Sequence, residues 1–556
     1  MAHPGERWGV IPNYTGFQGN LIESPASSIE AIVRAMAGRR DEPPRLEPAP
    51  AVPDGRCAPP PERGWGWAIQ LYAARSRDSW GIGDLADLRR FGRWARSAGA
   101  SVVQISPLGA QPPTSPYQAC PYYSSSRRFR NTTYLRVEEI AGAERVASEL
   151  APLKAQAYAL NSNRLIDHDA VFALKSQALE LIFRAAPRPR GLAAWQRRQG
   201  RALIDFATFD ALAETHGAAW RSWPPSLQSP RARGVEQARA ELAERVAFHQ
   251  WAQFHLHQQL ARAAREVTLI ADIPVGFASD GFDAWRWQDL LAPDMRVGAP
   301  PDYFFPDGQD WGMPPFDPWK LQAAHFEPFI DAVRATTAHA NGLRLDHVMS
   351  LFRLFWIPGG SGAVAGAYVR YPSNALLAML AAESRRSASF VIGEDLGLVE
   401  PRVKTSLQRV GALGYRLLWF ETEPSESWPQ QSVAAIGTHD LPTVAGIWRG
   451  TEPDHRQHHL RSRLVDATGM PDASDALEVA VAAYRRLATS KSCLVLASLE
   501  DALAVDERPN VPGTTTEWPN WRLALPVPLE EIEEAEGPRR IAEVMAGANR
   551  SPKAPH

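Results

Sequence analysis

From residue 64 onward the chain alternates short apolar runs with segments in which apolar residues recur at helical spacing. Eight runs are rich in β-branched and aromatic side chains and predict strands. They cover residues 67–73, 101–106, 267–274, 342–347, 389–395, 415–421, 434–440 and 492–501. Helical stripes lie between them, such as Phe329, Ile330 and Val333. Eight strands that alternate with helices predict an α/β fold, a closed (β/α)8 TIM barrel.

Two stretches are too long to be simple connections between a strand and a helix. About 160 residues separate the second run from the third, and their pattern is helical, so we expect an inserted helical subdomain at about 132–265. The segment 276–318 is rich in Trp, Pro and Asp and predicts a long ordered loop that acts as a lid. We therefore assign residues 64–550 to one barrel domain, and we expect no C-terminal β-sandwich because no all-β stretch follows the last run.

The first 63 residues differ from the barrel domain in composition and in their pattern of apolar residues. Residues 10–38 predict a small appendage that ends in a helix, and residues 39–63 contain eight prolines. Proline lacks an amide proton and restricts φ, so the second stretch predicts an extended linker. Residues 1–63 are thus an N-terminal appendage with a Pro-rich linker.

Charge and histidine spacing exclude two classes of partner. Lysine and arginine total 60 against 62 acidic residues, a net charge of −2, and the arginines are dispersed. A nucleic-acid binder normally has a basic excess, so we expect no nucleic-acid partner. His455, His458 and His459 have a spacing that metal ligands use, but they lie among charged residues and predict a solvated helix face. We expect neither a metal nor a cofactor.

Cysteines and hydropathy indicate the compartment. Cys57, Cys120 and Cys493 are far apart and do not form a CxxC pair, which excludes a disulfide framework and is typical of a reducing compartment. The N-terminus does not resemble a signal peptide, and we find no apolar run of about 18 residues. The sequence predicts a cytoplasmic protein without membrane segments.

Acidic and basic residues stand at the carboxyl ends of several predicted strands, where barrels of this class carry their active sites. They are Asp272, Arg344, Asp346, Glu394, His439 and Asp440. Charges at the end of a buried strand are costly unless they are paired or used, although any single one of them could simply cap a helix or pair with an arginine. Three carboxylates from three strands suit glycosidic chemistry, which needs a nucleophile, a proton donor about 5 Å away and a group that holds hydroxyls.

Aromatic residues also favour a sugar ligand. The chain has 19 tryptophans, and the segment 297–318 combines aromatic rings with polar side chains. These are Asp302, Tyr303, Phe304, Phe305, Asp307, Gln309 and Trp311. Aromatic faces stack on sugar rings while carboxylates and amides bind hydroxyls.

Eight segments in order carry a resemblance to a known family. They are WGIGDLADL (80–88), CPYYSSSRRFRN (120–131), ADIPVGFASDGFDAW (271–285), VGAPPDYFFPDGQDWG (297–312), GLRLDHVMSLFRLFWIP (342–358), GEDLGLVEPRV (393–403), GTHDLPT (437–443) and NVPGTTTEWPNWR (510–522). The chain resembles the amylomaltases, the 4-α-glucanotransferases of glycoside hydrolase family 77. The resemblance spans most of residues 65–525.

This resemblance implies roles for individual residues. Asp346 matches the family nucleophile, Glu394 the acid/base and Asp440 the transition-state stabiliser. The implied substrate-binding residues are Arg344, His439, Tyr122, Asp302, Gln309, Trp311, Asp272 and Asp280. Physically, Arg344 should keep Asp346 ionised, and neighbouring carboxylates should raise the pKa of Glu394.

The implied activity is retaining transfer of α-1,4-glucan segments between maltodextrins or to glucose, with donor and acceptor glucans as partners. Two alternatives remain open at this point. One is an α-glucan hydrolase with the same pair of carboxylates, and the other is a non-catalytic glycan-binding protein.

Overall fold

A computed structural model describes residues 4–45, 55–302, 305–397, 399–452 and 457–551. Eight parallel strands close into a barrel in the spatial order β11-β14-β15-β16-β17-β4-β5-β8. Their bounds are β4 Gly64–Ile69, β5 Val102–Ile105, β8 Thr268–Ile273, β11 Gly342–Leu345, β14 Phe390–Gly393, β15 Leu413–Leu417, β16 Ser432–Ala435 and β17 Leu494–Ser498. Each overlaps one predicted run, so the predicted TIM barrel is confirmed. The largest boundary error is at β16, which ends at Ala435 rather than 440.

The strands form because their side chains are buried on both faces. Every residue of β11, β14 and β16 is buried, as expected for a parallel sheet that closes on itself and is covered by helices. Ile270, Ile392 and Leu413 belong to one apolar cluster with residues from β5, β16 and β17. The barrel interior is therefore a packed core, and chemistry is confined to its ends.

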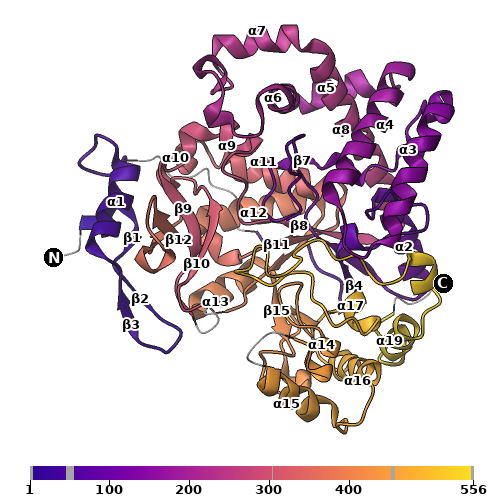
Figure 1. Cartoon of the computed structure of the whole chain (residues 1–556). Helices are drawn as coiled ribbons and strands as arrows, with labels where there is room; N and C mark the ends of the chain where they lie inside the picture. The colour runs from indigo at the N-terminus through magenta and orange to yellow at the C-terminus, as the bar shows by residue number, and fades with distance from the viewer. Residues whose placement is uncertain (1–3, 46–54, 303–304, 398, 453–456, 552–556) are drawn as a thin grey trace.

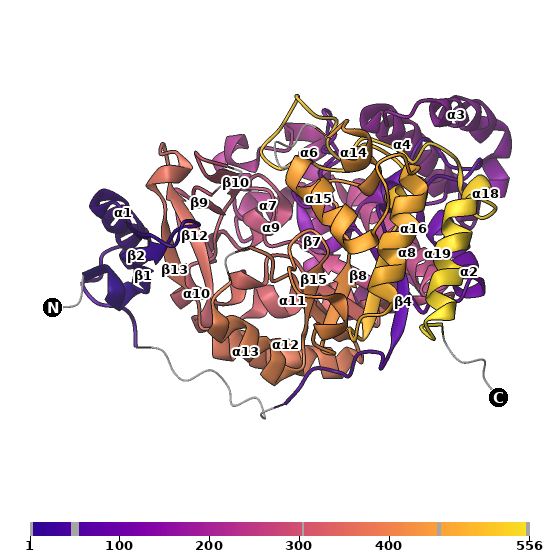
Figure 2. The ribbon, with the colours of Figure 1, turned by 90° about the horizontal axis from the view of Figure 1, so that it is seen from below.

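Helices surround the barrel (Figures 1 and 2). They are α2 Leu85–Ser97, α11 Glu327–Thr336, α12 Ser373–Ser387, α13 Pro401–Val410, α14 Val444–Arg449, α15 Gln457–Thr468, α16 Ala476–Ala488, α17 Leu499–Ala502, α18 Leu529–Ile532 and α19 Glu536–Gly547. α13, for example, turns an apolar face toward the barrel and buries Val403, Leu407 and Val410. Figure 2 shows α16 and α19 side by side, and the described residues after β17 form helices and loops without a further strand.

Between β5 and β8 the chain leaves the barrel and returns. This stretch holds a short hairpin, β6 Gly109–Ala110 and β7 Ser126–Arg130, followed by helices. The helices are α3 Ala147–Ala159, α4 His168–Ala185, α5 Leu192–Gln199, α6 Arg201–His216, α7 Arg233–Glu241 and α8 Ala243–Ala263. In Figure 1 they lie above the barrel and to its right.

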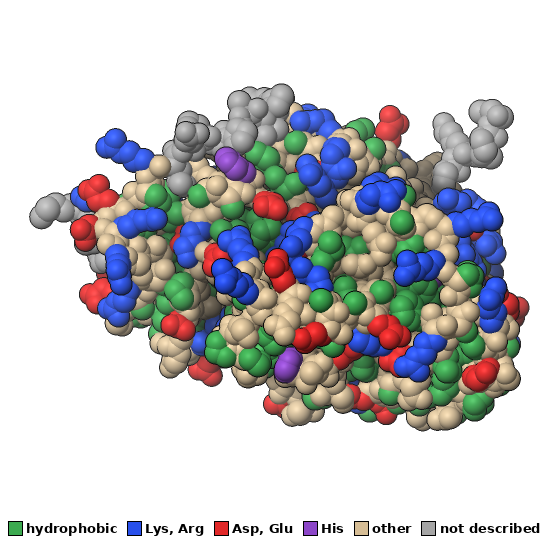
Figure 3. All heavy atoms as spheres, turned by 90° about the horizontal axis from the view of Figure 1, so that it is seen from above, with side chains coloured by type: hydrophobic (Ala, Val, Ile, Leu, Met, Phe, Trp, Pro, Cys, Tyr) green, Lys and Arg blue, Asp and Glu red, His purple; other side chains and the backbone are tan. Residues whose placement is uncertain are grey.

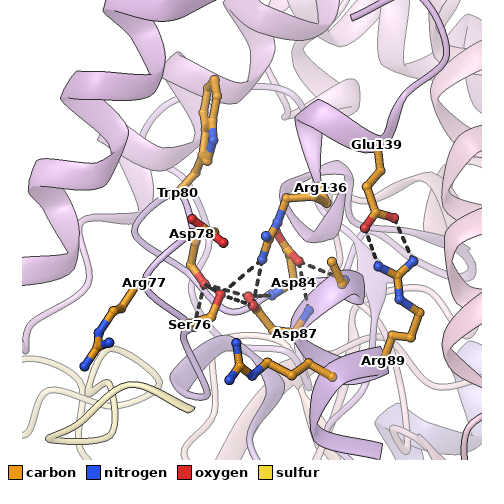
Figure 4. Close-up of polar contacts among 12 residues, drawn as sticks. Ser76, Arg77, Asp78, Trp80, Asp84, Asp87, Arg89, Arg136 and Glu139 are labelled. Atoms are coloured by element: carbon orange, nitrogen blue, oxygen red, sulfur yellow. Dashed lines mark hydrogen bonds and ion pairs between the residues drawn. The ribbon is translucent and has the colours of Figure 1, made fainter. Parts of the chain in front are cut away.

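A buried group of charges joins this helical region to the barrel (Figure 4). Asp84 caps the N-terminus of α2 and accepts a hydrogen bond from Arg136 Nε at 2.7 Å, while Arg136 Nη2 donates to Asp87 at 2.6 Å. Lys175 of α4 lies 3.7 Å from Asp84. The side chains of Asp84 and Asp87 are almost fully buried, so their charges depend on these partners. The contacts hold the loop between β4 and α2 against the inserted helices.

A second sheet lies beside the barrel in the order β1-β13-β12-β9-β10. Its strands are β1 Val10–Ile11, β9 Met295–Ala299, β10 Gln309–Met313, β12 Arg353–Pro358 and β13 Ala367–Arg370. The segment 276–318, predicted as a long loop, instead contributes the short helix α9 Phe282–Arg286 and two strands of this sheet. The prediction was wrong there because β9 pairs with β12, more than 50 residues further along the chain, and no local pattern reveals such a partner.

The N-terminal appendage packs onto this second sheet. Its strand β1 pairs with β13, and its helix α1 Ala26–Ala37 buries Ile29, Ile32 and Met36 in the same apolar cluster as Leu354. A hairpin, β2 Asn13–Thr15 with β3 Leu21–Glu23, projects from it in Figure 1. Part of the predicted Pro-rich linker, residues 46–54, lies outside the described residues.

The surface shows no extended region of one charge on the face seen in Figure 3. Blue Lys and Arg side chains lie among red acidic and green apolar ones. In the described part of the chain, no helix has an apolar stretch long enough to cross a bilayer.

Candidate active site

The register of neighbouring strands brings Asp346 and Glu394 together. Leu345, the last residue of β11, pairs with Gly393, the last of β14, so Asp346 and Glu394 are the next positions along each strand. The pairing continues past the strand ends, since the Glu394 N–H donates to Leu345 O at 2.9 Å and the Asp346 N–H to Ile273 O at 3.1 Å. Paired strands lie about 4.8 Å apart, close to the separation of about 5 Å at which two carboxylates can share one glycosidic bond.

Arg344 binds two of the predicted carboxylates at once. Its buried Nη1 donates to Asp272 Oδ2 at 2.6 Å and to Asp346 Oδ1 at 2.9 Å. Burial raises the pKa of Asp272 even though Arg344 lowers it, and the two carboxylates keep the pKa of Arg344 far above its usual value despite its burial. Arg344 thus fixes the orientation of both carboxylates through charge-assisted hydrogen bonds.

Glu394 is held by backbone N–H groups. The His347 N–H donates to Oε2 at 2.9 Å and the Leu396 N–H to Oε1 at 2.8 Å. His347 has a φ of 43°, in the left-handed region, so the chain turns sharply after Asp346 and aims this N–H at Glu394. Burial raises the pKa of Glu394 to about 7, with a further contribution from Asp346. Glu394 can therefore both give and take a proton near neutral pH.

Asp440 and His439 lie on the loop that follows β16. Asn510 Nδ2 donates to Asp440 Oδ1 at 2.6 Å, and His439 Nε2 lies 3.3 Å from Asp440 Oδ2. Burial favours a higher pKa for Asp440, but His439 and Asn510 outweigh it and hold this pKa below its usual value. The pKa of His439 is raised because Asp440 outweighs the effect of burial. The pair therefore presents an ionised carboxylate beside a ring that takes up a proton more readily than a free histidine does.

Tyr122 provides an aromatic floor next to this pair. It lies in the loop between β6 and β7, and its hydroxyl donates to Asp272 Oδ2 at 2.6 Å. Its ring stacks on His439 with the centroids 4.8 Å apart and an interplanar angle of 26°. The Trp521 ring contacts both, at 5.3 Å from Tyr122 and 5.2 Å from His439.

A cleft of about 740 Å³ opens above these groups. Its lining combines charged, polar and aromatic side chains, among them Asp302, Phe305, Arg344, Glu394, Phe420, Asp440 and Trp518. A smaller cavity of about 60 Å³ lies beside it and is lined by Tyr122, Asp272, Arg344, His439 and Glu500, among others. Most predicted site residues thus meet at one end of the barrel.

Gln309 and Trp311 are on β10 rather than in a loop. The Trp311 Nε1–H donates to Gln309 Oε1 at 3.2 Å, and the Trp311 ring lies edge-on to His347 at 5.3 Å. Trp311 therefore contacts the turn that binds Glu394. The predicted Tyr303 and Phe304 lie outside the described residues.

Asp280 does not join this group. It accepts a hydrogen bond from Arg221 of the helical region at 3.2 Å, and half of its side chain is exposed. It lines neither of the two cavities at the barrel end. A motif position alone did not show that the loop after β8 turns this side chain outward.

Sequence reasoning missed Asn510, Trp518 and Trp521 as site residues. All three belong to the segment 510–522, which was recognised only as a motif, and its approach to the barrel end is a tertiary feature. Glu500 was also missed, although it follows a barrel strand. Burial raises the pKa of Glu500 to about 7 beside His439.

The described part of the chain contains no candidate metal-binding site. No group of three or more His, Cys, Asp or Glu side chains is close enough there to hold an ion. Of the three closely spaced histidines His455, His458 and His459, the first lies outside the described residues.

Comparison with known proteins agrees with this geometry. Residues 69–529 match a family model described as 4-alpha-glucanotransferase, glycoside hydrolase family 77. The chain is 38% identical over 555 residues to a 4-alpha-glucanotransferase of Mycobacterium tuberculosis, with 88% of this chain and 76% of the relative covered. It is 32% identical to one of Haemophilus influenzae, with 84% and 76% covered.

Solved structures share the fold. An amylomaltase from Corynebacterium glutamicum matches with a TM-score of 0.85 and 26% identity, covering 97% of this chain and 98% of that one. An amylomaltase from Streptococcus agalactiae in complex with acarbose matches with a TM-score of 0.74 and 20% identity, covering 88% and 100%. The second likeness shows the fold alone.

Proposed function

Because the chain belongs to the 4-alpha-glucanotransferases of glycoside hydrolase family 77, we propose that Asp346, Glu394 and Asp440 carry out its transfer reaction. The enzyme is a 4-alpha-glucanotransferase, an amylomaltase, that acts on α-glucans. The observation that carries the assignment of roles is the strand register, which makes Asp346 and Glu394 neighbours at the carboxyl end of the barrel. The steps below follow from that pairing.

In the first step Asp346 attacks the anomeric carbon of a donor α-1,4-glucan. The bond from that carbon to the glycosidic oxygen breaks, and Glu394 gives its proton to the leaving oxygen. The transferred glucan is then held as an ester of Asp346. Arg344 supports this step because its hydrogen bond holds the Asp346 carboxylate in position until the new bond forms.

In the second step Glu394 acts as a base. It takes the proton from the 4-hydroxyl of an acceptor glucan, and that oxygen attacks the anomeric carbon while Asp346 leaves. Two displacements at one carbon retain the α configuration. A pKa of about 7 for Glu394 suits both its acid and its base role.

Asp440, His439 and Tyr122 bind the sugar that is transferred. The ionised Asp440 accepts hydrogen bonds from sugar hydroxyls, and His439 donates one from a ring N–H. Tyr122 packs its flat ring against the apolar face of the sugar. Such contacts favour transfer most where they strengthen as positive charge develops at the anomeric carbon.

Transfer competes with hydrolysis, so acceptor sugars must be held where water is scarce. The aromatic side chains Phe305, Phe420 and Trp518 line the cleft beside Glu394 and supply stacking surfaces for an acceptor. Maltodextrins serve as donors, and maltodextrins or glucose as acceptors. A cytoplasmic location fits the three cysteines, which are all free thiols.

The decisive experiment follows the products of maltotriose. A ladder of longer maltodextrins plus glucose is expected for transfer, whereas glucose and maltose alone would identify a hydrolase. The Asp346→Asn variant should lose turnover by more than about 10³-fold while it still binds acarbose, because its side chain keeps its shape but cannot form the ester. The assigned roles would be wrong if this variant kept wild-type activity.

A further inference from the structure

Four nitrogen-bearing side chains converge where the helical region meets the barrel, away from the catalytic cleft. Arg130 stands at the end of β7, Arg198 on α5, His257 on α8 and His339 in a short 3-10 turn, Thr337–His339, that follows α11. None of them lines the catalytic cleft. Each comes from a different element, so the cluster exists only in the folded chain.

The two histidines contact each other directly. His339 Nε2 and His257 Nδ1 are 2.8 Å apart, and the ring centroids lie at 4.5 Å. Trp195, on the same helix as Arg198, packs against His257 at 5.7 Å. Within the described residues neither ring makes another hydrogen bond, so one nitrogen of each ring remains able to bind a further group.

Arg130 has no carboxylate partner among the described residues. On the same strand, Arg127 lies 3.8 Å from Asp283 and Arg128 pairs with Asp331. Arg130 instead donates to a backbone carbonyl, Ala335 O, at 2.7 Å, and forms no ion pair with a described residue. A partly buried guanidinium without a counter-ion is unfavourable unless an anion compensates it.

The histidine pKa values agree with an excess of positive charge. Burial and then Arg130 lower the pKa of His257 to about 4 and that of His339 to about 3. Arg198 and the neighbouring histidine act in the same direction, and no carboxylate opposes them. Burial also lowers the pKa of Arg130 to about 10.

A small cavity adjoins the cluster. It measures about 40 Å³, room for about three water-sized groups, and is lined by Arg127 to Arg130, Leu260, Thr336 and His339, among others. Asp272 lies in the lining too, but its carboxylate is bound to Arg344 and Tyr122. The space suits a compact ion and is too small for an oligosaccharide.

We propose that Arg130 and His339, which line this cavity, bind a compact tetrahedral oxyanion, namely phosphate, either free or as the terminal group of a phosphate monoester. His257 supports His339 from behind through their hydrogen bond, and Arg198 adds positive charge beside His257. Guanidinium and imidazole N–H groups are the donors that such an anion uses. The ion bridges β7 and the turn after α11, which the His257–His339 hydrogen bond joins to α8, and so ties the helical region to the barrel. This proposal is independent of the catalytic roles assigned above.

The first test measures anion binding to the full chain by calorimetry and thermal unfolding, in sulfate or phosphate at constant ionic strength set with chloride. Both anions should raise the unfolding temperature of the wild type more than chloride does. The Arg130→Met variant should bind sulfate at least about 10-fold more weakly, since it loses a charge-assisted pair. The Arg231→Met variant, whose arginine is exposed, pairs with Asp289 and does not line this cavity, should bind like the wild type.

A second measurement depends on the histidines and does not require Arg130→Met to fold. Sulfate remains a dianion between pH 5 and 8, and a bound dianion raises the pKa of both rings, so its affinity should increase as the pH falls. His257→Gln and His339→Gln should flatten this dependence. Comparing orthophosphate with a hexose monophosphate shows whether the site takes the free ion or the ester. Equal effects of sulfate on the wild type and Arg130→Met, or none beyond chloride, would overturn the proposal.

Discussion

Replacing Asn510 by Ala removes the hydrogen bond at 2.6 Å that its amide donates to Asp440. Asp440 keeps His439 as a partner, so the carboxylate stays in the site but is held from one side only. We expect the variant to stay active, but Asp440 should bind the sugar hydroxyls more weakly in the transition state. The loss should therefore appear in kcat/KM more than in the stability of the fold.

The size of the effect follows from the kind of bond. A hydrogen bond to a charged group contributes about 1.5–3 kcal/mol, which corresponds to roughly a 10- to 150-fold loss in kcat/KM. Asn510 also lowers the pKa of Asp440. Because activity needs Asp440 ionised, the variant should lose activity at a higher pH than the wild type as the solution is acidified.

The assay measures initial rates of glucose release from maltotriose across a pH series. Asn520→Ala is the matched control, since Asn520 braces the same segment through the Val511 N–H and Thr514 O but does not contact Asp440. Thermal unfolding of both variants separates a disturbed loop from a lost contact. If Asn510→Ala keeps the wild-type kcat/KM and acid limb, or if Asn520→Ala reproduces its shift in pH, the role given to Asn510 is wrong.

Two further outcomes follow from the buried charges. Glu394 must be protonated to release the leaving glucan, and its pKa is about 7. We therefore expect kcat/KM for maltotriose to fall as the pH rises through about 7, and a kcat/KM that stays flat to pH 9 would contradict this. Arg136→Met leaves Asp84 and Asp87 buried without their main partner and should destabilise the fold by about 3–5 kcal/mol, measured as a lower unfolding temperature. The control is Arg89→Met, which breaks a more exposed ion pair and should cost less than about 1 kcal/mol.

The barrel could be predicted from the sequence because each of its strands shows a recognisable pattern among neighbouring residues. Parallel strands buried on both faces are short apolar runs, and the helices between them show an apolar stripe. The acids at the carboxyl ends of β11 and β14 were equally visible, since a charge next to such a run stands out. Family motifs then supplied expected roles for Asp346, Glu394 and Asp440.

Local sequence patterns could not predict the second sheet or the side chains that surround the catalytic carboxylates. β9 looks like loop in the sequence because it pairs with β12, a strand far along the chain, and β10 joins the sheet only by pairing with β9. Asn510 reaches Asp440 across 70 residues, and His257 meets His339 across 82. A side chain in a motif also does not reveal its direction, as the exposed Asp280 shows.

The amino-acid sequence by itself determined that eight buried strands alternate with helices and that carboxylates follow several of them, because hydrophobic period and strand length are properties of neighbouring residues. Only the tertiary structure determined that Asp346 and Glu394 are neighbours in register, that Arg344 binds two carboxylates, and that Arg130 has no carboxylate partner among the described residues. Distance, burial and charge balance arise from segments that meet only when the barrel closes.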